Sequence, residues 1–340
     1  MPNATSTLPL ECGKEQALRR RTMEFVLFVL ALSACFARPL YALGQYSLHD
    51  EFFSYIPLIP VISLYLFWLK RPVLPRQQAR LSWKWGAAAA LGGLAALIGW
   101  AWASHSGGCL RYWAARDVLM REAFPGGWRW AAHPGWKSQL EDYLTFMTAS
   151  YLLFVLAGCL LFFGAATLRL LAFPIAFLAF MVPIPSAALD WTMSFFQATS
   201  AATAGGFLTA AMMPVDRQGL ILYLPGFSLI IAPECSGIHS TMVLLITSLL
   251  AGHLFLHSAW KRALLVIVVV PLAILRNGFR VFVIGELCVH ISRDMINSPI
   301  HRKGGPIFFV LSLIPFFALL LFLRKSELPA SKTVNATAKT

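Results

Sequence analysis

The stretch from Pro306 to Leu323 reads PIFFVLSLIPFFALLLFL, and it is followed directly by Arg324 and Lys325. A helix of about 20 apolar residues crosses the roughly 30 Å hydrocarbon core of a bilayer. Basic residues beside a span are enriched on the cytoplasmic side of the membrane. The stretch therefore predicts a transmembrane helix whose C-terminal end lies in the cytoplasm.

The composition of the whole chain points to the same class of protein. Of its 340 residues, 58% are hydrophobic and 13% are charged, and the mean hydropathy is +0.67. A soluble domain carries about a quarter of charged residues, so the chain falls in the membrane class. Basic residues that flank spans explain the formal net charge of +13. The chain has no basic stripe with interleaved aromatic residues, which argues against nucleic-acid binding.

Several segments share the length and apolar character of the last one. The predicted spans are 23–43, 52–69, 85–103, 143–163, 166–184, 235–257, 262–284 and 306–323. With both termini in the cytoplasm, the main basic clusters beside these spans fall on the cytoplasmic side. We therefore predict an all-α polytopic membrane protein with about eight transmembrane helices. The predicted organisation is a cytoplasmic N-terminal segment 1–22, a single transmembrane domain 23–323 and a disordered cytoplasmic tail 324–340.

Two segments outside the spans are expected on the outer face. The loop 104–142 carries charges of both signs and many tryptophans, which indicates a small folded or interfacial segment. The segment 189–213 is rich in Ala, Thr, Ser and Gly and holds Asp190 and Gln197. If it crossed the bilayer, every later basic cluster would face outward. We expect a helix that lies at the outer interface or re-enters the protein, and a spanning helix stays open as an alternative.

A short hairpin is predicted next, so that the whole interfacial segment covers 189–232. Val215–Gly219 is typical of a turn, and Ile221–Leu224 is typical of a strand. Pro225 and Gly226 form a turn signal, and Phe227–Ile231 is the second strand candidate. The hairpin would lead directly to Cys235.

Three reactive side chains, distant in sequence, are expected at one depth. Cys235 opens a span that ends near His257, 22 residues or about 33 Å later. Arg280 follows Arg262 by 18 residues, about 27 Å, and so returns to the outer boundary. His301 precedes the last span and lies just outside it. Periodicity and charge therefore predict that Cys235, Arg280 and His301 share the outer face.

These three side chains suit acyl transfer by a cysteine nucleophile. A helix N-terminus and a nearby guanidinium both favour the reactive thiolate of Cys235. Arg280 can stabilise an oxyanion, and His301 can carry a proton between leaving and incoming groups. Each also has a plain structural reading, as a core thiol, a snorkelling anchor and a polar loop residue. Spacing alone leaves the functional and the structural readings open.

Three further polar residues are candidates for supporting roles. Arg276 lies one turn before Arg280, so it faces the same site or pairs with an acid. Asn277 supports the site or, more simply, bonds backbone or a neighbouring helix. His239 lies one turn after Cys235 and is a candidate second base.

The motifs around these residues resemble those of the exosortase/archaeosortase family. The run Ile231–Ile238, IAPECSGI, resembles its cysteine motif, and Asn277–Val281, NGFRV, resembles its arginine motif. The run His301–Gly305, HRKGG, is similar to its third motif, a His with a Gly four residues on and aromatic residues beyond. The resemblance covers about residues 50–323 and keeps the order of the motifs.

The resemblance implies a cysteine transpeptidase of the bacterial inner membrane with its active site facing the periplasm. Such an enzyme recognises exported proteins by a C-terminal sorting signal: a short motif such as Pro-Glu-Pro, a transmembrane helix and a basic tail. It implies Cys235 as the nucleophile that forms a thioester, Arg280 as the stabiliser of the oxyanion or thiolate, and His301 as the proton shuttle. The acceptor stays open between a polysaccharide and a lipid. No metal or organic cofactor is implied.

The sequence departs from the family pattern at three places. His239 stands where many members have Arg, Ser54–Ile56 stands where Ser-His-Gly is usual, and Ile300 replaces a common acidic residue. These departures predict a divergent subtype. Two other functions stay open: a non-enzymatic component of exopolysaccharide export, and a membrane thiol protease that releases its substrate by hydrolysis. The small number of ionisable residues inside the spans counts against a transporter.

Overall fold

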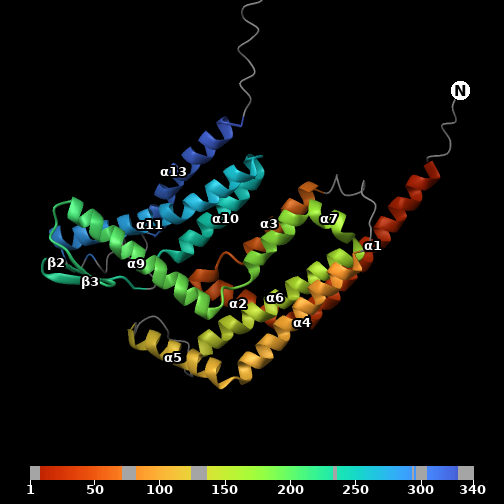
Figure 1. Ribbon diagram of the computed structural model, residues 1–340, viewed down its shortest axis with the longest axis horizontal. Helices are drawn as coiled ribbons and strands as arrows, with labels where there is room; N and C mark the ends of the chain where they lie inside the picture. Colours follow the sequence, from red (N-terminus) through yellow and green to blue (C-terminus); the bar gives the residue numbers. More distant parts are fainter. Residues whose placement is uncertain are drawn as a thin grey trace, which may run out of the picture. The chain divides into compact units, whose positions relative to one another are not determined.

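A computed structural model describes residues 8–70, 82–123, 136–232, 236–292, 295 and 305–327. The chain forms two compact units, Met1–Ala188 and Leu189–Thr340. Both consist almost entirely of helices, and the described part of the second unit adds one small sheet (Figure 1). Cys235, Ile300 and His301 lie outside the described residues, as does the part of the predicted disordered tail from 328 onward.

The first unit is a set of apolar helices around α6. Its elements are α1 (Leu8–Cys35), α2 (Ala37–His49), η1 (Glu51–Phe53), α3 (Leu58–Lys70), α4 (Trp83–His105), α5 (Gly107–Ala123), α6 (Trp136–Phe162), α7 (Gly164–Leu170), α8 (Ala172–Phe177) and η3 (Leu178–Met181). Helix α6 makes its most extensive contacts with α4 and also packs against α1, α2 and α5. The ring of Phe154 on α6 lies over Gly93 of α4, where a Cβ atom would come within 3.2 Å of it.

A polar cluster ties the end of α2 to the start of α6. Tyr46 donates its hydroxyl to Oε1 of Glu141 at 2.9 Å, and Lys137 Nζ donates to Oδ2 of Asp50 at 2.8 Å. Glu141 is only 1% exposed, so its charge needs such partners. The four side chains satisfy one another and fix the entry of the chain into α6.

The second unit packs three long helices against one another. These are α10 (Ile238–Phe255), α11 (Ala259–His290) and α13 (Gly305–Lys325), and each contacts the other two (Figure 1). Their shared core includes Leu244 of α10, Leu265 and Val269 of α11, and Phe316 and Leu320 of α13. Helix α9 (Ser186–Ala210) lies almost entirely in this unit and precedes the sheet.

The sheet is antiparallel, in the order β1 (Asp216–Gln218), β2 (Ile221–Leu224) and β3 (Phe227–Ile230). Leu222 pairs with Leu229, and both point into a core that also contains Leu208 of α9. The turn between β2 and β3 is Pro225-Gly226, where Gly226 takes a φ of 84° that side chains with a Cβ rarely adopt. The predicted hairpin is therefore confirmed. The prediction of a turn at Val215–Gly219 is wrong, because Asp216–Gln218 pair with β2 and form a third strand.

The predicted all-α polytopic class is confirmed, whereas the number of eight spans is not. Among the described residues, five helices are long and apolar enough to cross a membrane: α4, most of α6, α10, α11 and α13. Two predicted spans, 23–43 and 166–184, fall on helix pairs bent by 74° and 75°, which raise the number to seven if each pair is one span. The predicted span 52–69 contains α3, whose 13 residues extend only about 20 Å.

The segment 189–213 is a helix, as expected, and it is observed as α9 from Ser186 to Ala210. It is not among the described helices that are apolar enough to span a membrane. The expected folded segment at 104–142 contains α5 and the beginning of α6, and residues 124–135 lie outside the described part.

Candidate functional site

Helix α11 carries three neighbouring polar residues in an otherwise apolar sequence. Arg276 and Asn277 are 8% and 2% exposed, and Arg280 is half-buried. Since residues four apart lie on the same side of a helix, Arg276 and Arg280 share one face. Burial of polar side chains costs free energy unless they have hydrogen-bond partners, so the contacts of these three side chains define the site.

Asn277 and the glycine after it join α11 closely to α9. Asn277 Nδ2 donates to Oγ of Ser200 at 2.9 Å. At Gly278, a Cβ atom would lie only 2.6 Å from Cβ of Thr203, so only glycine allows the two helices to approach this far. The expectation that Asn277 bonds a neighbouring helix is confirmed.

Gln197 of α9 holds the end of the chain that leaves β3. Its Nε2 donates to the carbonyl oxygen of Ile231 at 2.8 Å, and the backbone N–H of Ile231 donates to the carbonyl of Leu220 at 3.0 Å. Gln197 and Ile231 are 7% and 1% exposed, so this bond is shielded from water. Both backbone groups of Ile231, four residues before Cys235, are therefore hydrogen-bonded.

Arg276 holds the chain at Gly237, two residues after Cys235. Its Nη2 donates to the carbonyl oxygen of Gly237 at 3.1 Å, and Nη1 is buried without a hydrogen-bond partner among the described residues. The same carbonyl accepts bonds from the backbone N–H and hydroxyl of Thr241, at 3.0 and 2.7 Å, and from the hydroxyl of Ser240 at 3.1 Å. Gly237 takes a φ of 73°, and a Cβ atom there would lie 2.8 Å from Oδ1 of Asn277. Gly237 is thus in direct contact with the arginine motif.

Helix α10 begins one residue after Gly237, at Ile238. Its first backbone N–H groups have no carbonyl of a preceding turn to bond, so this end of the helix favours negative charge. His239 lies in this first turn, half-buried, and its Nδ1 has no hydrogen-bond partner in the described ranges. Its role as a second base stays a prediction. Within the described ranges, no group of three or more His, Cys, Asp or Glu side chains could hold a metal ion.

The start of α13 also approaches the arginine motif. The ring of Phe279 contacts that of Phe308 edge to face, with 6.2 Å between the ring centroids. Phe279 is the residue before Arg280, and Phe308 follows the run His301–Gly305 by three residues. The described neighbours of the three predicted motifs therefore gather around Arg276–Arg280 of α11.

The described residues thus bring together Arg276, Asn277 and the chain beside Cys235, with Arg280 on the same helix face as Arg276. The structure does not describe Cys235 or His301, so their approach stays a prediction. Sequence reasoning missed the roles of Gln197 and Ser200. Their spacing of three residues, which puts two polar side chains on one face of α9, was the available signal.

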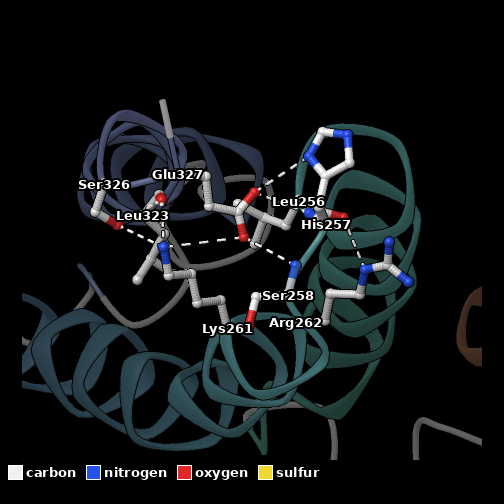
Figure 2. Close-up of polar contacts among 8 residues, drawn as sticks. All are labelled: Leu256, His257, Ser258, Lys261, Arg262, Leu323, Ser326 and Glu327. Atoms are coloured by element: carbon white, nitrogen blue, oxygen red, sulfur yellow. Dashed lines mark hydrogen bonds and ion pairs between the residues drawn. The ribbon is translucent and has the colours of Figure 1, made fainter. Parts of the chain in front are cut away.

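A second polar cluster lies at the start of α11 (Figure 2), where Lys261 and Arg262 precede Arg280 by about 27–29 Å along the helix. The carboxylate of Glu327 accepts bonds from the backbone N–H groups of His257 at 2.8 Å and Ser258 at 2.9 Å. Lys261 Nζ donates to Oγ of Ser326 at 2.8 Å, and Arg262 Nε donates to the carbonyl of Leu256 at 2.8 Å. The backbone bonds from His257 and Ser258 hold the pKa of Glu327 below its ordinary value. This cluster joins the end of α13 to the α10–α11 turn and is separate from the candidate site.

A comparison with known families matches the chain to a family model described as Transmembrane exosortase (Exosortase_EpsH), over residues 47–318. Searches of curated proteins and of solved structures found no match. The matched range runs from the last residues of α2 into the second half of α13, and it includes the whole candidate site. Exosortases are multi-pass membrane proteins that process sorting signals on exported proteins, generally as transpeptidases or proteases. Since most of its length matches the family model, the chain belongs to the transmembrane exosortase family.

Proposed function

We propose that this protein is a cysteine transpeptidase that cleaves C-terminal sorting signals of exported proteins and transfers the proteins to an acceptor. Cys235 is the nucleophile, Arg280 stabilises the oxyanion and the thiolate, and His301 moves the proton. The enzyme acts in the bacterial inner membrane with its site facing the periplasm. The sorting signal consists of a short Pro-Glu-Pro-like motif, a transmembrane helix and a basic tail.

The observation that carries the proposal is the contact between Gly237 and the arginine motif. Arg276 binds the carbonyl of Gly237 at 3.1 Å, and Asn277 packs against the α-carbon of the same glycine. Cys235 is two residues away, and consecutive α-carbons are about 3.8 Å apart. Covalent geometry therefore keeps the α-carbon of Cys235 within about 8 Å of that of Gly237, which Arg276 and Asn277 contact.

The histidine is constrained in the same way. His301 lies four positions before Gly305, where α13 begins, so the chain holds its α-carbon within about 14 Å of that helix. The contact between Phe308 and Phe279 supports an approach of this end of α13 to Arg280. These constraints favour one site made from three distant motifs.

The reaction follows from the chemistry of the three groups. The Cys235 thiolate attacks the carbonyl carbon of the scissile peptide bond, and Arg280 stabilises the resulting oxyanion. The C–N bond then breaks, the leaving amine takes a proton from the imidazolium of His301, and a thioester remains. The acceptor attacks the thioester, gives its proton to His301, and releases the Cys235 thiolate. With water as the acceptor, the same steps give hydrolysis.

Substitution of Cys235 tests the proposal. We expect Cys235→Ala and Cys235→Ser to insert into the membrane at normal levels and to leave substrates unprocessed, as seen by the size of an exported protein with the tripartite signal. Cys35→Ser, which changes an exposed thiol on α1, is the matched control and should process normally. Complete processing by either Cys235 variant would contradict the enzyme and favour a non-enzymatic role in export. Mass spectrometry of the product separates the two chemistries, because hydrolysis leaves a free C-terminal carboxylate and transfer leaves an adduct.

A further inference from the structure

On each side of Cys235, a side chain that serves no reactant in the proposed mechanism attaches the chain to a neighbouring helix. Gln197 of α9 binds the carbonyl of Ile231, four residues before Cys235, at 2.8 Å. Arg276 of α11 binds the carbonyl of Gly237, two residues after Cys235, at 3.1 Å. The two attachments enclose the loop that carries the proposed nucleophile.

We propose that Gln197 and Arg276 are positioning residues for the proposed nucleophile, because they fix the chain at Ile231 and at Gly237, on the two sides of Cys235. The inference rests on the proposed function for its catalytic consequence. The fixing of the loop itself can be measured without any substrate.

The burial of the two bonds indicates that they constrain the loop strongly. Gln197, Ile231 and Arg276 are all less than 9% exposed, so water cannot readily replace either donor. Loss of Gln197 would leave the buried carbonyl of Ile231 without its side-chain donor, which is costly. The carbonyl of Gly237 keeps its bonds from Thr241 and Ser240 but loses its connection to α11.

The two helices that supply these side chains are themselves fixed to each other. Asn277, next to Arg276, donates to Ser200, which lies one turn from Gln197. Gly278 packs against Thr203 at the following turn of α9. The two attachment points, at Ile231 and Gly237, are therefore held by helices that are fixed to each other.

The charge of Arg276 has a second consequence for the thiol. A guanidinium near the N-terminus of α10 adds to the positive potential of that helix end, and both favour the thiolate. In this scheme Arg280 serves the reacting atoms, and Arg276 binds the backbone carbonyl of Gly237 through Nη2. It therefore acts through the loop and through its charge.

Hydrogen exchange in the full-length protein in detergent tests the loop directly. We expect Gln197→Met and Arg276→Met to speed exchange in the peptide 231–241 by about tenfold. Arg262→Met is the matched control, because Arg262 lies on the same helix and also binds a backbone carbonyl, that of Leu256, at the far end. Unchanged exchange at 231–241 in both test variants would overturn the inference.

Alkylation of Cys235 separates positioning from a general loss of stability. Peptide-level mass spectrometry with iodoacetamide gives the alkylation rate of this thiol from pH 5 to 10 in each variant. In the test variants we expect the midpoint of the profile to move toward the ordinary thiol pKa of about 8.5. Arg276→Lys, which keeps a charged donor, should restore the wild-type midpoint at least in part. A lower unfolding temperature with an unchanged midpoint would mean that the two residues are only structural, and the inference would fall.

Processing assays connect the loop to catalysis. We expect each test variant to process at least about tenfold more slowly than the wild type, with a larger effect on kcat than on KM. Faster exchange with normal processing would overturn the positioning role. Normal processing by Cys235→Ala would instead overturn the proposed function, and the exchange result would still decide whether the loop is fixed.

Discussion

Gly237→Ala is the substitution for which the site geometry makes the sharpest prediction. The new Cβ atom would lie 2.8 Å from Oδ1 and 2.9 Å from Cγ of Asn277, and 3.0 Å from Nη2 of Arg276. None of these atoms can easily retreat, because Asn277 is bonded to Ser200 and Arg276 to Gly237 itself. The added methyl group must therefore displace part of the site.

The magnitude has two parts. The left-handed backbone at Gly237, with a φ of 73°, costs a residue with a Cβ about 1–2 kcal/mol. Overpacking against two buried side chains costs about 1–3 kcal/mol more. We expect a total loss of about 2–5 kcal/mol in the free energy of unfolding of the second unit.

Gly206→Ala is the matched control, since Gly206 lies on α9 with no atom within 4 Å of a new Cβ. There alanine should raise the stability slightly, by up to about 1 kcal/mol, because it favours a helix over glycine. Thermal unfolding in detergent and alkylation of Cys235 measure both variants. If Gly237→Ala unfolds at the wild-type temperature and keeps the wild-type alkylation profile, the contact of Gly237 with Asn277 and Arg276 is wrong, and the proposed site loses its main support.

Two further substitutions test the frame and the far end of the bundle. Gly278→Ala should lower the unfolding temperature because its Cβ would meet Thr203 at 2.6 Å, and Thr203→Gly in the same chain should restore part of the loss; an equal loss in the single and double variants would refute this helix contact. Because the pKa of Glu327 is lowered in the folded state, its contribution to stability is present above the ordinary carboxyl pKa of about 4.3 and is lost as the pH falls through the lower folded value. Glu327→Gln should therefore flatten the acid limb of a stability–pH profile, and an unchanged limb would show that the bonds to His257 and Ser258 contribute little.

The sequence predicted the helical class because hydrophobic length is a local property. The runs that became α4, α10, α11 and α13 each contain enough apolar residues to cross a bilayer without reference to any neighbour. The bends in the predicted spans 23–43 and 166–184 were not predictable in this way. The bends lie at Phe36 and at Leu171, and each is followed within three residues by a proline, Pro39 and Pro174, whose effect on the helix a hydropathy window does not register.

The third strand shows a related limit. Asp216, Arg217 and Gln218 are exposed polar residues, so no alternation of buried and exposed positions distinguishes them from a turn. They form a strand because β2 offers backbone groups on its free edge, and Arg217 pairs with Leu222. Strand pairing of this kind is decided by the neighbour and not by the residues themselves.

At the site, side-chain chemistry identified the residues on α11, but their partners depend on helix packing. Arg276 and Asn277 stood out because polar groups are rare in an apolar helix. Gln197 was noted only as a polar residue of the segment 189–213, and Ser200 is one of many small polar residues of α9, so their partners appear only with the packing of the helices. The hydropathy of a sequence does not show which backbone carbonyl a buried side-chain amide will bind. The residues that fix the loop therefore become visible only when the helices are assembled, whereas the reactive groups can be recognised from the sequence.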